Sequence, residues 1–554
     1  MDPRRPRLQT LGADLTAGVT VALVGLPQCL AYAMMSGLPP AYGLTTAAVP
    51  GVIAALAGRS AQVVTGPTNT TGLLILAALA PYLGPDGFLG AEGLPTLATL
   101  TLLAGLIRLL AARVGAASLI RFLPESFLVG FTAGAGILIA TMQLDEALGL
   151  DPIRGAGLVE EVVGLGEALS RSAPSWPASL VAFGTAAVVL MGMKRNPHVP
   201  VALLTVIATT IVVMLTGADA SSGLPLVSDR APLPSGWPPG ALPDVHPSTL
   251  ARLLAPAAAI ALLGTLELTV SASAAGGRPD LRREIQAQGW ANLAGAFSSA
   301  FPASASLTRS ALLRLGGART RLAAASGAVF VVPLLLFAGP VVESIPQASL
   351  AGVLFATAWS MVDVRRMSRA VNVWRSPRAV MLTSLLATLV LPLELAVFAG
   401  TGLALVLHLA EDSHPHLRAW AVQRGSLAHL EGTPAAVAIE VSGNLHFAAA
   451  STLPDAVFAL VPASARDVII DLTHAHAIRW RAVDALEEID AALGRRGARL
   501  HICGAPDRLL HALEREGRPL SATGQSELPG AALQECIVAV SRLSQNDAPT
   551  DATS

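Results

Sequence analysis

Apolar segments follow one another along the chain from Asp14 to Ala410, and only short loops separate them. About fourteen segments fit into this stretch, although several are shorter than the roughly 20 residues that a helix needs to cross a bilayer alone. The chain has a mean hydropathy of +0.58 and only 14% charged residues, as expected of a protein with many membrane spans. The predicted segments are 14–33, 44–58, 67–80, 96–112, 126–144, 177–193, 199–216, 250–270, 285–300, 303–313, 322–340, 346–362, 379–391 and 393–410.

Basic residues gather in every second loop between these segments. Arg59, Lys194 and Arg282 belong to one set of loops, whereas the loop 145–175 on the other side is acidic. By the positive-inside rule, the basic loops and the N-terminal residues 1–13 are expected in the cytoplasm. An even number of spans returns the C-terminus to the same side.

Charge and cysteine content exclude several classes of partner. The formal net charge of -1 argues against a nucleic-acid partner. Cys29, Cys503 and Cys536 are far apart and fit neither a disulfide framework nor the spacing of a metal site. No cleavable signal peptide is expected, because the first apolar stretch is too long for one. We therefore expect no metal and no cofactor.

One arginine stands inside the tenth apolar segment, within the sequence FPASASLTRSALLRL. A charge at membrane depth costs roughly 3 kcal/mol on the insertion scale, so such a residue usually faces a cavity and holds an opposite charge. Arg309 follows Pro302 and the hydroxyl residues Ser304, Ser306 and Thr308. A cation with hydroxyl groups and the free amides of a helix start favours binding of an anion.

Two segments begin with a proline break at corresponding places. The third opens with TGPTNTTGLL from Thr65, and the tenth opens with Phe301-Pro302. Three plus seven is ten, so the breaks match if the chain consists of two halves of about seven helices each. Paired short segments of this kind indicate a transporter's binding site. Their positive N-terminal ends would both face one ligand near the middle of the membrane.

Glu267 lies in the middle of the eighth segment, among apolar residues. Burial favours the protonated form of a carboxyl group, which suits a proton carrier that enters with an anion. A sodium site is the alternative, with Thr265 and Thr269 as further oxygen ligands. A structural pair between Glu267 and Arg309 is a third reading. Arg108, near the end of the fourth segment, is predicted to be an interface residue whose head reaches the aqueous surface.

Several motifs together resemble one family. The first segment reads LPQCLAYAMMSGLPPAYGL from Leu26 to Leu44, and the later stretches TGPT, D-x3-E-x3-Q-G-x2-N from Asp280, LTRS and VESIPQASLAGVLF also fit. The chain resembles the SulP anion transporters, or solute carrier family 26. The resemblance implies fourteen transmembrane segments in a seven-plus-seven inverted repeat. Segments 1–4 and 8–11 would form a core domain, segments 5–7 and 12–14 a gate domain, and the core would move like an elevator.

The resemblance also implies where the substrate binds. In this family the site lies between the starts of segments 3 and 10, lined by segments 1 and 8. Carried over by motif position, the substrate residues are Gln28, Tyr32, Thr68, Thr308 and Arg309, and the coupling-ion residue is Glu267. Ser306 joins them as a second hydroxyl that either donates to the ligand or caps the half-helix. The resemblance further implies a homodimer in a lipid bilayer.

The composition becomes that of a soluble protein after Ala410. Residues 411–434 are interpreted as a linker, and residues 545–554 as a disordered tail. Between them, 435–544 alternates strand-like stretches such as VIIDLTH with a helical stretch, RAVDALEEIDAALGRR. This α/β pattern resembles a STAS domain.

The leading hypothesis is a secondary active transporter of small anions in a bacterial inner membrane, coupled to protons. Family members imply dicarboxylates such as fumarate, sulfate and bicarbonate as candidate substrates. A sodium-coupled bicarbonate symporter, or an uncoupled anion exchanger or channel, remains open. A sensor that uses the STAS domain as output is a further alternative. No catalytic constellation indicates an enzyme, and Arg309 disfavours a nucleobase carrier.

Overall fold

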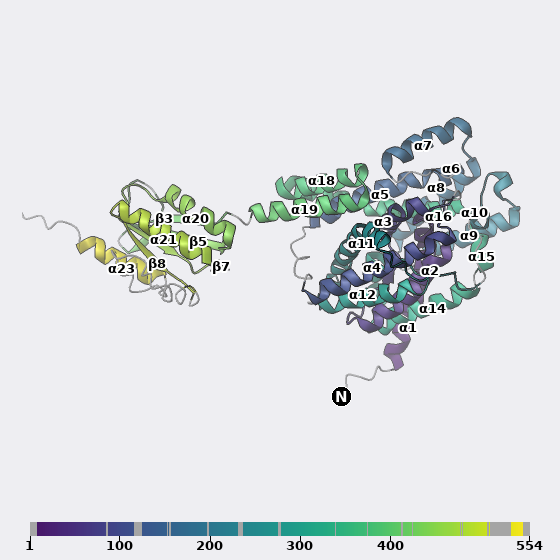
Figure 1. Ribbon diagram of the computed structural model, residues 1–554, viewed down its shortest axis with the longest axis horizontal. Coiled ribbons are helices and arrows are strands. Elements are labelled where there is room, and N and C mark those ends of the chain that lie inside the picture. The colour runs from purple at the N-terminus through teal and green to yellow at the C-terminus, as the bar shows by residue number, and fades with distance from the viewer. Residues whose placement is uncertain are drawn as a thin grey trace, which may run out of the picture. The chain divides into compact units, whose positions relative to one another are not determined.

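The structure is a computed structural model of the chain, and it divides into two compact units, Met1–Leu405 and Val406–Ser554. It describes residues 8–546 except 85–86, 116–124, 152, 154–156, 197–198, 231–235, 275–278, 338, 374, 412–413, 424, 431, 477, 479, 507–508 and 510–532. The N-terminal arginines, Arg121 and Arg278 lie outside the described residues, as does most of the predicted tail. Figure 1 shows the first unit as helices and the second as strands and helices.

Fourteen of the described helices correspond to the predicted segments, so that prediction is confirmed. Six described helices are long and apolar enough to cross a membrane alone, and others are shorter apolar helices. The fourteen are α1 (Leu8–Met35), α2 (Pro40–Ala57), α3 (Asn69–Leu79), α4 (Leu94–Arg113), α5 (Glu125–Met142), α8 (Trp176–Arg195), α9 (Val201–Thr216), α11 (Pro247–Ser273), α12 (Leu281–Ala296), α13 (Leu307–Leu315), α14 (Leu322–Phe337), α16 (Gln347–Met361), α18 (Arg375–Val390) and α19 (Leu393–Glu411).

Shorter helices that the apolar pattern did not predict occupy the loops. Two lie in the acidic loop, α6 (Leu144–Leu148) and α7 (Leu158–Arg171). Three more are α10 (Val227–Arg230), α15 (Gly339–Glu343) and α17 (Val364–Val373). The arginine-rich α17 has its N-terminal amides bound by Asp363, whose Oδ1 accepts from the backbone N–H of Arg365 and Arg366. Polar helices of this kind carry no hydropathy signal, so segment counting misses them.

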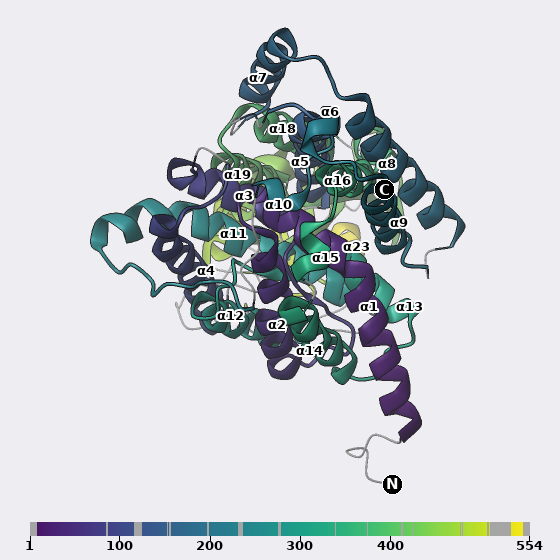
Figure 2. The same cartoon turned by 90° about the vertical axis from the view of Figure 1, so that its right-hand side faces the viewer.

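The helices of the first unit pack in two groups. In one, α12 packs on α4 and α2, α14 packs on α1 and α2, and α11 packs on α3 and α4. In the other, α18 packs on α5, and α16 packs on α5 and α8. Figure 2 shows α14 beside α1 and α2 in the first group. The first group contains helices that the sequence analysis expected in a core domain, and the second contains helices that it expected in a gate domain. We use these two names for the groups, which meet where α1 contacts α16 and α9.

Glycine allows a close contact between the backbones of α1 and α14. A Cβ atom on Gly18 of α1 would lie 2.2 Å from the carbonyl oxygen of Ala323, and one on Gly327 of α14 would lie 2.6 Å from that of Gly18. Small residues let helix backbones approach where lipid gives no hydrophobic drive for association. The backbones of α1 and α14 therefore contact each other directly at Gly18 and Gly327.

The second unit is an α/β domain with a mixed sheet. The described strands are β3 (His416–Gln423), β4 (Ser426–Ala428), β5 (Ala436–Asn444), β6 (Asp467–Asp471), β7 (Ala475–His476) and β8 (Arg499–Cys503). Their order is β4-β3-β5-β6-β8, with β7 beside β5; β5, β6 and β8 are parallel to each other. The sheet therefore begins within 411–434, which the sequence analysis interpreted as linker.

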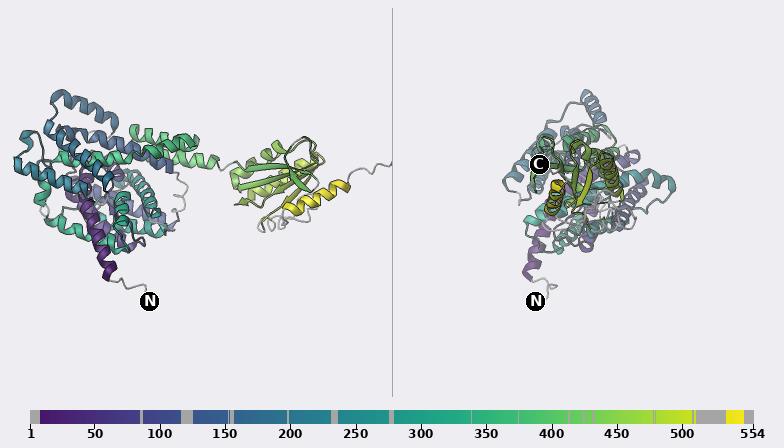
Figure 3. Two further views of the ribbon diagram at one scale, coloured as in Figure 1. Left: turned by 180° about the vertical axis from the view of Figure 1, so that it is seen from behind. Right: turned by 90° about the vertical axis from the view of Figure 1, so that its left-hand side faces the viewer.

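Helices cover both faces of this sheet. An apolar cluster under α20 (Phe447–Leu460) and α21 (Trp480–Arg495) contains Val437, Ile470 and Leu486. A second cluster under α23 (Leu533–Asn546) contains Cys503 and Cys536. Figure 3 shows α23 in yellow next to the green strands. The parallel strands β6 and β8 are buried on both faces, as expected for parallel strands.

At the start of β6, Asp467 is bound by the side chains of Arg499 and His501. Nε and Nη2 of Arg499 donate to the Asp467 carboxylate at 2.9 and 3.2 Å. Nε2 of His501 lies 3.0 Å from the same carboxylate. Burial raises the pKa of Asp467, but the hydrogen bonds from His501 and Arg499 outweigh it, so the pKa lies below its usual range. The carboxylate is therefore held in its charged form between β6 and β8.

Candidate functional site

Two short strands meet as an antiparallel pair inside the core domain, and we call their meeting point the crossing. The strand β1 (Thr65–Gly66) pairs antiparallel with β2 (Ser304–Ala305), with Thr65 opposite Ala305. Each strand lies beside a proline, Pro67 or Pro302, that prevents a helix from continuing through it. The two predicted breaks therefore meet, although they are far apart in the sequence.

A half-helix begins directly after each strand. Thr68 is the N-cap residue of α3, and Ser306 is the N-cap residue of α13. Ser306 Oγ accepts from the backbone N–H of Arg309 at 3.4 Å. Both helix starts lie at the β1–β2 crossing, so the positive ends of two helix dipoles meet near one point.

The face of α12 towards the strands fixes this crossing. Gln288 Nε2 donates to Thr65 Oγ1 at 2.6 Å, and Asn292 binds both the N–H and the carbonyl of Ala303, at 2.7 and 3.1 Å. Both residues belong to the D-x3-E-x3-Q-G-x2-N motif, where a four-residue spacing places them on one helix face. The sequence analysis used the motif only for the resemblance and did not assign these roles.

Arg309 is buried at the crossing, with 3% of its surface exposed. Its Nη2 donates to the carbonyl oxygen of Pro67 at 2.6 Å, and its Nη1 lies 3.4 Å from Sγ of Cys29. A Cβ atom on Gly66 would come within 2.9 Å of Nη1, so a glycine is needed for this approach. Arg309 forms no ion pair with Glu267 among the described residues. Its positive charge lies directly behind the start of α3.

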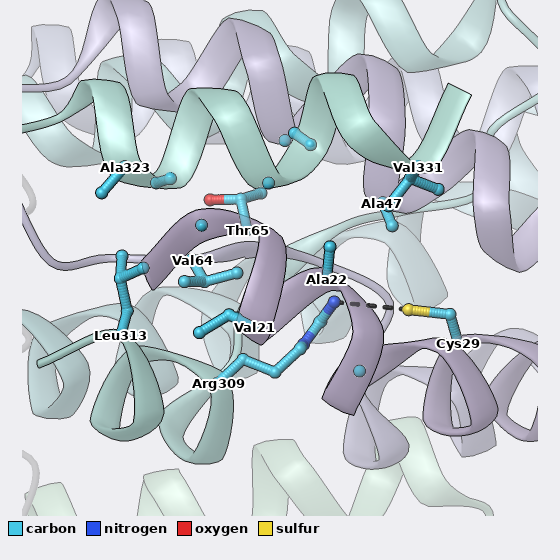
Figure 4. A pocket seen from close by; sticks show the side chains of 16 residues that line it. Val21, Ala22, Cys29, Ala47, Val64, Thr65, Arg309, Leu313, Ala323 and Val331 are labelled. Atoms are coloured by element: carbon cyan, nitrogen blue, oxygen red, sulfur yellow. Dashed lines mark hydrogen bonds between the residues drawn. The ribbon is translucent and has the colours of Figure 1, made fainter. Parts of the chain in front are cut away.

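A small cavity borders Arg309 inside the core. Figure 4 shows the guanidinium extending towards Cys29, with Thr65 and Ala22 nearby. The cavity measures about 30 Å³ and lies between α1, α2, β1, α13 and α14. A water molecule needs roughly 10–15 Å³ of such space, so the cavity has room for water beside Arg309.

Glu267 on α11 contacts the start of α3. Its carboxylate accepts hydrogen bonds from Thr70 Oγ1 and, at 3.2 Å, from Thr68 Oγ1. The side chain is 5% exposed. Thr265 and Thr269, the expected sodium ligands, instead donate to the backbone of their own helix. Residues two positions apart on a helix do not face each other, so these threonines point away from Glu267.

The prediction for Arg108 is wrong. Arg108 does not reach the aqueous surface; it is 1% exposed. Its Nη1 donates to the carbonyl of Ala303 at 2.7 Å, and its Nη2 donates to that of Ile260 at 3.4 Å. The fourth helix carries Arg108 between α11 and α12, and tertiary packing of this kind is invisible to hydropathy.

The other predicted substrate residues occupy different surroundings. Thr308 is exposed at the start of α13, and Gln28 is half-buried on α1. Tyr32, on α1, is 6% exposed, and α1 packs against α16. The structure thus brings Thr68, Glu267, Ser306 and Arg309 to the crossing, while Tyr32 marks the boundary with the gate domain.

Comparison with known proteins identifies the family. The profile of the sulfate permease family matches residues 11–384, and the STAS domain profile matches residues 428–519. The chain belongs to the sulfate permease family. The family has the fold and domain order that the motifs predicted, and the STAS match confirms the C-terminal assignment.

Sequence relatives of this sulfate permease family member are mainly sulfate transporters. A probable sulfate transporter of Mycobacterium tuberculosis is 33% identical over 412 residues, covering 73% of this chain and 71% of the relative. A putative sulfate transporter of Bacillus subtilis is 27% identical, covering 91% and 94%. The bicarbonate transporter BicA of Picosynechococcus is 25% identical, covering 73% and 71%.

Solved structures share the fold. Murine solute carrier 26 family member A9, in an inward-facing state, superposes with a TM-score of 0.81 at 17% identity, covering 98% of this chain and 93% of that chain. The transmembrane domain of BicA superposes with a TM-score of 0.62 at 23% identity, covering 72% and 99%. These structures show the fold, and the family profiles and sequence relatives show that this sulfate permease family member is an anion transporter with a C-terminal STAS domain.

Proposed function

We propose that this protein carries small divalent or monovalent oxyanions and carboxylates, with sulfate as the first candidate, and that the anion binds at the facing starts of α3 and α13. The observation that carries the proposal is the buried guanidinium of Arg309 behind both helix starts, 2.6 Å from the Pro67 carbonyl. Sulfate transporters among the relatives support the substrate class. Thr308 and Gln28 lie on the accessible side and would contact the anion.

Protons are the proposed coupling ion. Glu267 is buried, and the hydroxyls of Thr68 and Thr70 bind it directly at the start of α3. A bound anion would place negative charge near this carboxylate and make its protonation easier. Proton and anion would then enter together, and the charge moved through the membrane would be smaller.

Sodium coupling is the second candidate, and one observation favours it. Thr68 and Thr70 place two hydroxyl oxygens beside the carboxylate of Glu267, and oxygen ligands suit a hard cation. These threonines replace Thr265 and Thr269 as candidate ligands. The bicarbonate transporter BicA among the relatives makes bicarbonate the companion substrate of this alternative.

The core domain would move against the gate domain. In the described part of the chain, α1 packs against α16, and Asn69 Nδ2 of α3 lies 2.9 Å from Sδ of Met361 at the end of α16. An elevator movement would break these contacts. We further propose a homodimer in a bacterial inner membrane with both termini in the cytoplasm, following the arginine-rich loops and the family resemblance.

The test is uptake of radiolabelled sulfate, fumarate and bicarbonate into proteoliposomes under an imposed proton gradient or an imposed sodium gradient. Proton-driven uptake of one anion that is lost in Glu267→Gln supports the proposal and names the substrate. Uptake driven by sodium alone moves the assignment to the second candidate. Uptake that follows only a counter-anion gradient would instead indicate an exchanger.

A further inference from the structure

The centre of the core domain contains more positive charge than the proposed site uses. The buried charged side chains of the described first unit are Asp14, Arg108, Asp145, Glu161, Glu267, Glu284 and Arg309. Asp14 and Glu284 bind loop backbone N–H groups, of Arg319 and Arg59 among others, and Asp145 and Glu161 belong to α6 and α7. Two arginines and one carboxylate therefore remain at the crossing, where the mechanism above uses only Arg309 and Glu267.

Arg108 approaches the same part of α11 that carries Glu267. Its Nη2 binds the carbonyl of Ile260, and a Cβ atom on Gly264 would lie 1.9 Å from that nitrogen. Gly264 and Glu267 are three positions apart and share a helix face. Ser304 joins this part of α11 to the start of β2, since its Oγ donates to the Gly264 carbonyl at 3.1 Å.

The hydrogen bonds of Arg108 leave part of its charge unused. Its Nε is buried with no hydrogen-bond partner, as is Nε of Arg309, and the two backbone partners of Arg108 are neutral carbonyl groups. A buried cation is costly unless an opposite charge compensates it. Nη2 of Arg108 lies beside Gly264, one helical turn before Glu267, although the two charged groups are not within 4.0 Å of each other. Arg309 is turned towards Pro67 and Cys29.

We propose that Arg108 is the permanent counter-charge of Glu267 and a positioning residue for proton coupling, which leaves the charge of Arg309 for the transported anion. This inference rests on the proposed function for its role in transport. With Glu267 ionised, the three groups carry one net positive charge; with Glu267 protonated, they carry two. A dianion such as sulfate matches the protonated state, and a monoanion such as bicarbonate matches the ionised state.

The test is a double-mutant cycle on stability that needs no transport. The full-length protein is purified in detergent as Arg108→Gln, Glu267→Gln and the double variant, and thermal unfolding is followed at alkaline pH without anion. Each single change leaves a buried charge unpaired, so each lowers the unfolding midpoint. The double variant should lose clearly less than the sum of the two single shifts. Additive shifts overturn the pairing.

Two further variants separate pairing from packing. Arg108→Lys retains the positive charge and should lower the midpoint less than Arg108→Gln. The control cycle of Arg309→Gln with Glu267→Gln should be close to additive, and coupling as large as in the Arg108 cycle would overturn the choice of Arg108. If Arg108→Gln alone yields no folded protein, recovery on adding Glu267→Gln supports the pairing, and no recovery contradicts it.

The double-mutant cycle on stability and the transport assay test different claims, and either can fail without the other. A coupled Arg108–Glu267 cycle in a protein that shows no proton-driven uptake would retain the pairing and reject the proposed coupling. Proton-driven uptake with an additive cycle would retain the proposed function and reject the counter-charge role of Arg108.

Discussion

Nη2 of Arg309 lies 2.6 Å from the carbonyl oxygen of Pro67, so the cation of α13 is attached to the start of α3. Each residue belongs to a different half of the chain. A hydrogen bond that involves a charged group contributes about 1.5–3 kcal/mol. Both half-helices, the charge behind them and Glu267 therefore belong to one rigid body, and an anion bound there would travel with the core domain.

Gly66→Ala is expected to lower anion uptake by about tenfold or more. The new methyl group would lie 2.9 Å from Nη1 and 3.1 Å from Nη2 of Arg309, so the guanidinium must leave the Pro67 carbonyl. Loss of that charged hydrogen bond costs about 1.5–3 kcal/mol. Initial uptake rates of reconstituted protein measure the effect. The control is Gly402→Ala in α19, where nothing lies within 4 Å of the added atom; equal rates in both variants would refute the argument.

Thr70→Val separates the two candidate coupling ions. Valine keeps the shape of threonine but removes the hydroxyl that binds Glu267. If protons couple transport, uptake should fall by about tenfold or more but remain driven by the proton gradient, because one hydrogen bond to a charged group is lost. If sodium is bound by this hydroxyl, stimulation by sodium should disappear. The measurement is uptake at varied sodium concentration with a fixed proton gradient.

Gly264→Ala is expected to destabilise the core domain. The added Cβ atom would lie 1.9 Å from Nη2 of Arg108 and 2.8 Å from Oγ of Ser304, both in buried surroundings. Overpacking of this kind costs about 1–3 kcal/mol. Gly184→Ala in α8 is the matched control, because its Cβ atom would meet nothing within 4 Å. The thermal unfolding midpoint should fall for Gly264→Ala alone; an unchanged midpoint would show that Arg108 is not packed as described.

Asp467→Asn is expected to destabilise the STAS sheet in a pH-dependent way. The folded-state pKa of Asp467 is lowered, so its stabilising contribution is present above the ordinary aspartate pKa, about 3.9. The contribution is lost as the pH falls through the lower folded-state value. Hydrogen exchange of β6 and β8 in the full chain should be faster in the variant near neutral pH. The difference should shrink in acid; a difference that grows in acid would contradict this sign.

The prolines and glycines of the sequence predicted the functional centre better than the charged residues did. Pro67 and Pro302 indicated two broken helices at matching positions, and the structure pairs the strands beside them. The prediction that Arg108 reaches the aqueous surface was wrong, because its position near the end of a segment does not reveal how the neighbouring helices bury it. Thr265 and Thr269 were adjacent to Glu267 in sequence, but helix geometry turns them away from it.

The hydropathy pattern also failed to predict where the C-terminal domain begins. The strand β3 begins at His416 within the predicted linker, and it pairs with β5 through a register from His416 to Ala421. Its sequence HLRAWAVQ carries few large apolar residues. The strand is specified by its partner β5 rather than by its own composition.

The most direct test of the account is sulfate uptake into proteoliposomes by wild-type protein and by Arg309→Gln, with Arg314→Gln as a control on the same helix. Arg314 is only half-buried and donates to the Ser271 carbonyl at a long 3.4 Å. The account predicts proton-driven sulfate uptake by the wild type, its loss in Arg309→Gln, and rates close to wild type in Arg314→Gln. Unchanged uptake in a folded Arg309→Gln protein would contradict the assignment of the anion site to the facing starts of α3 and α13.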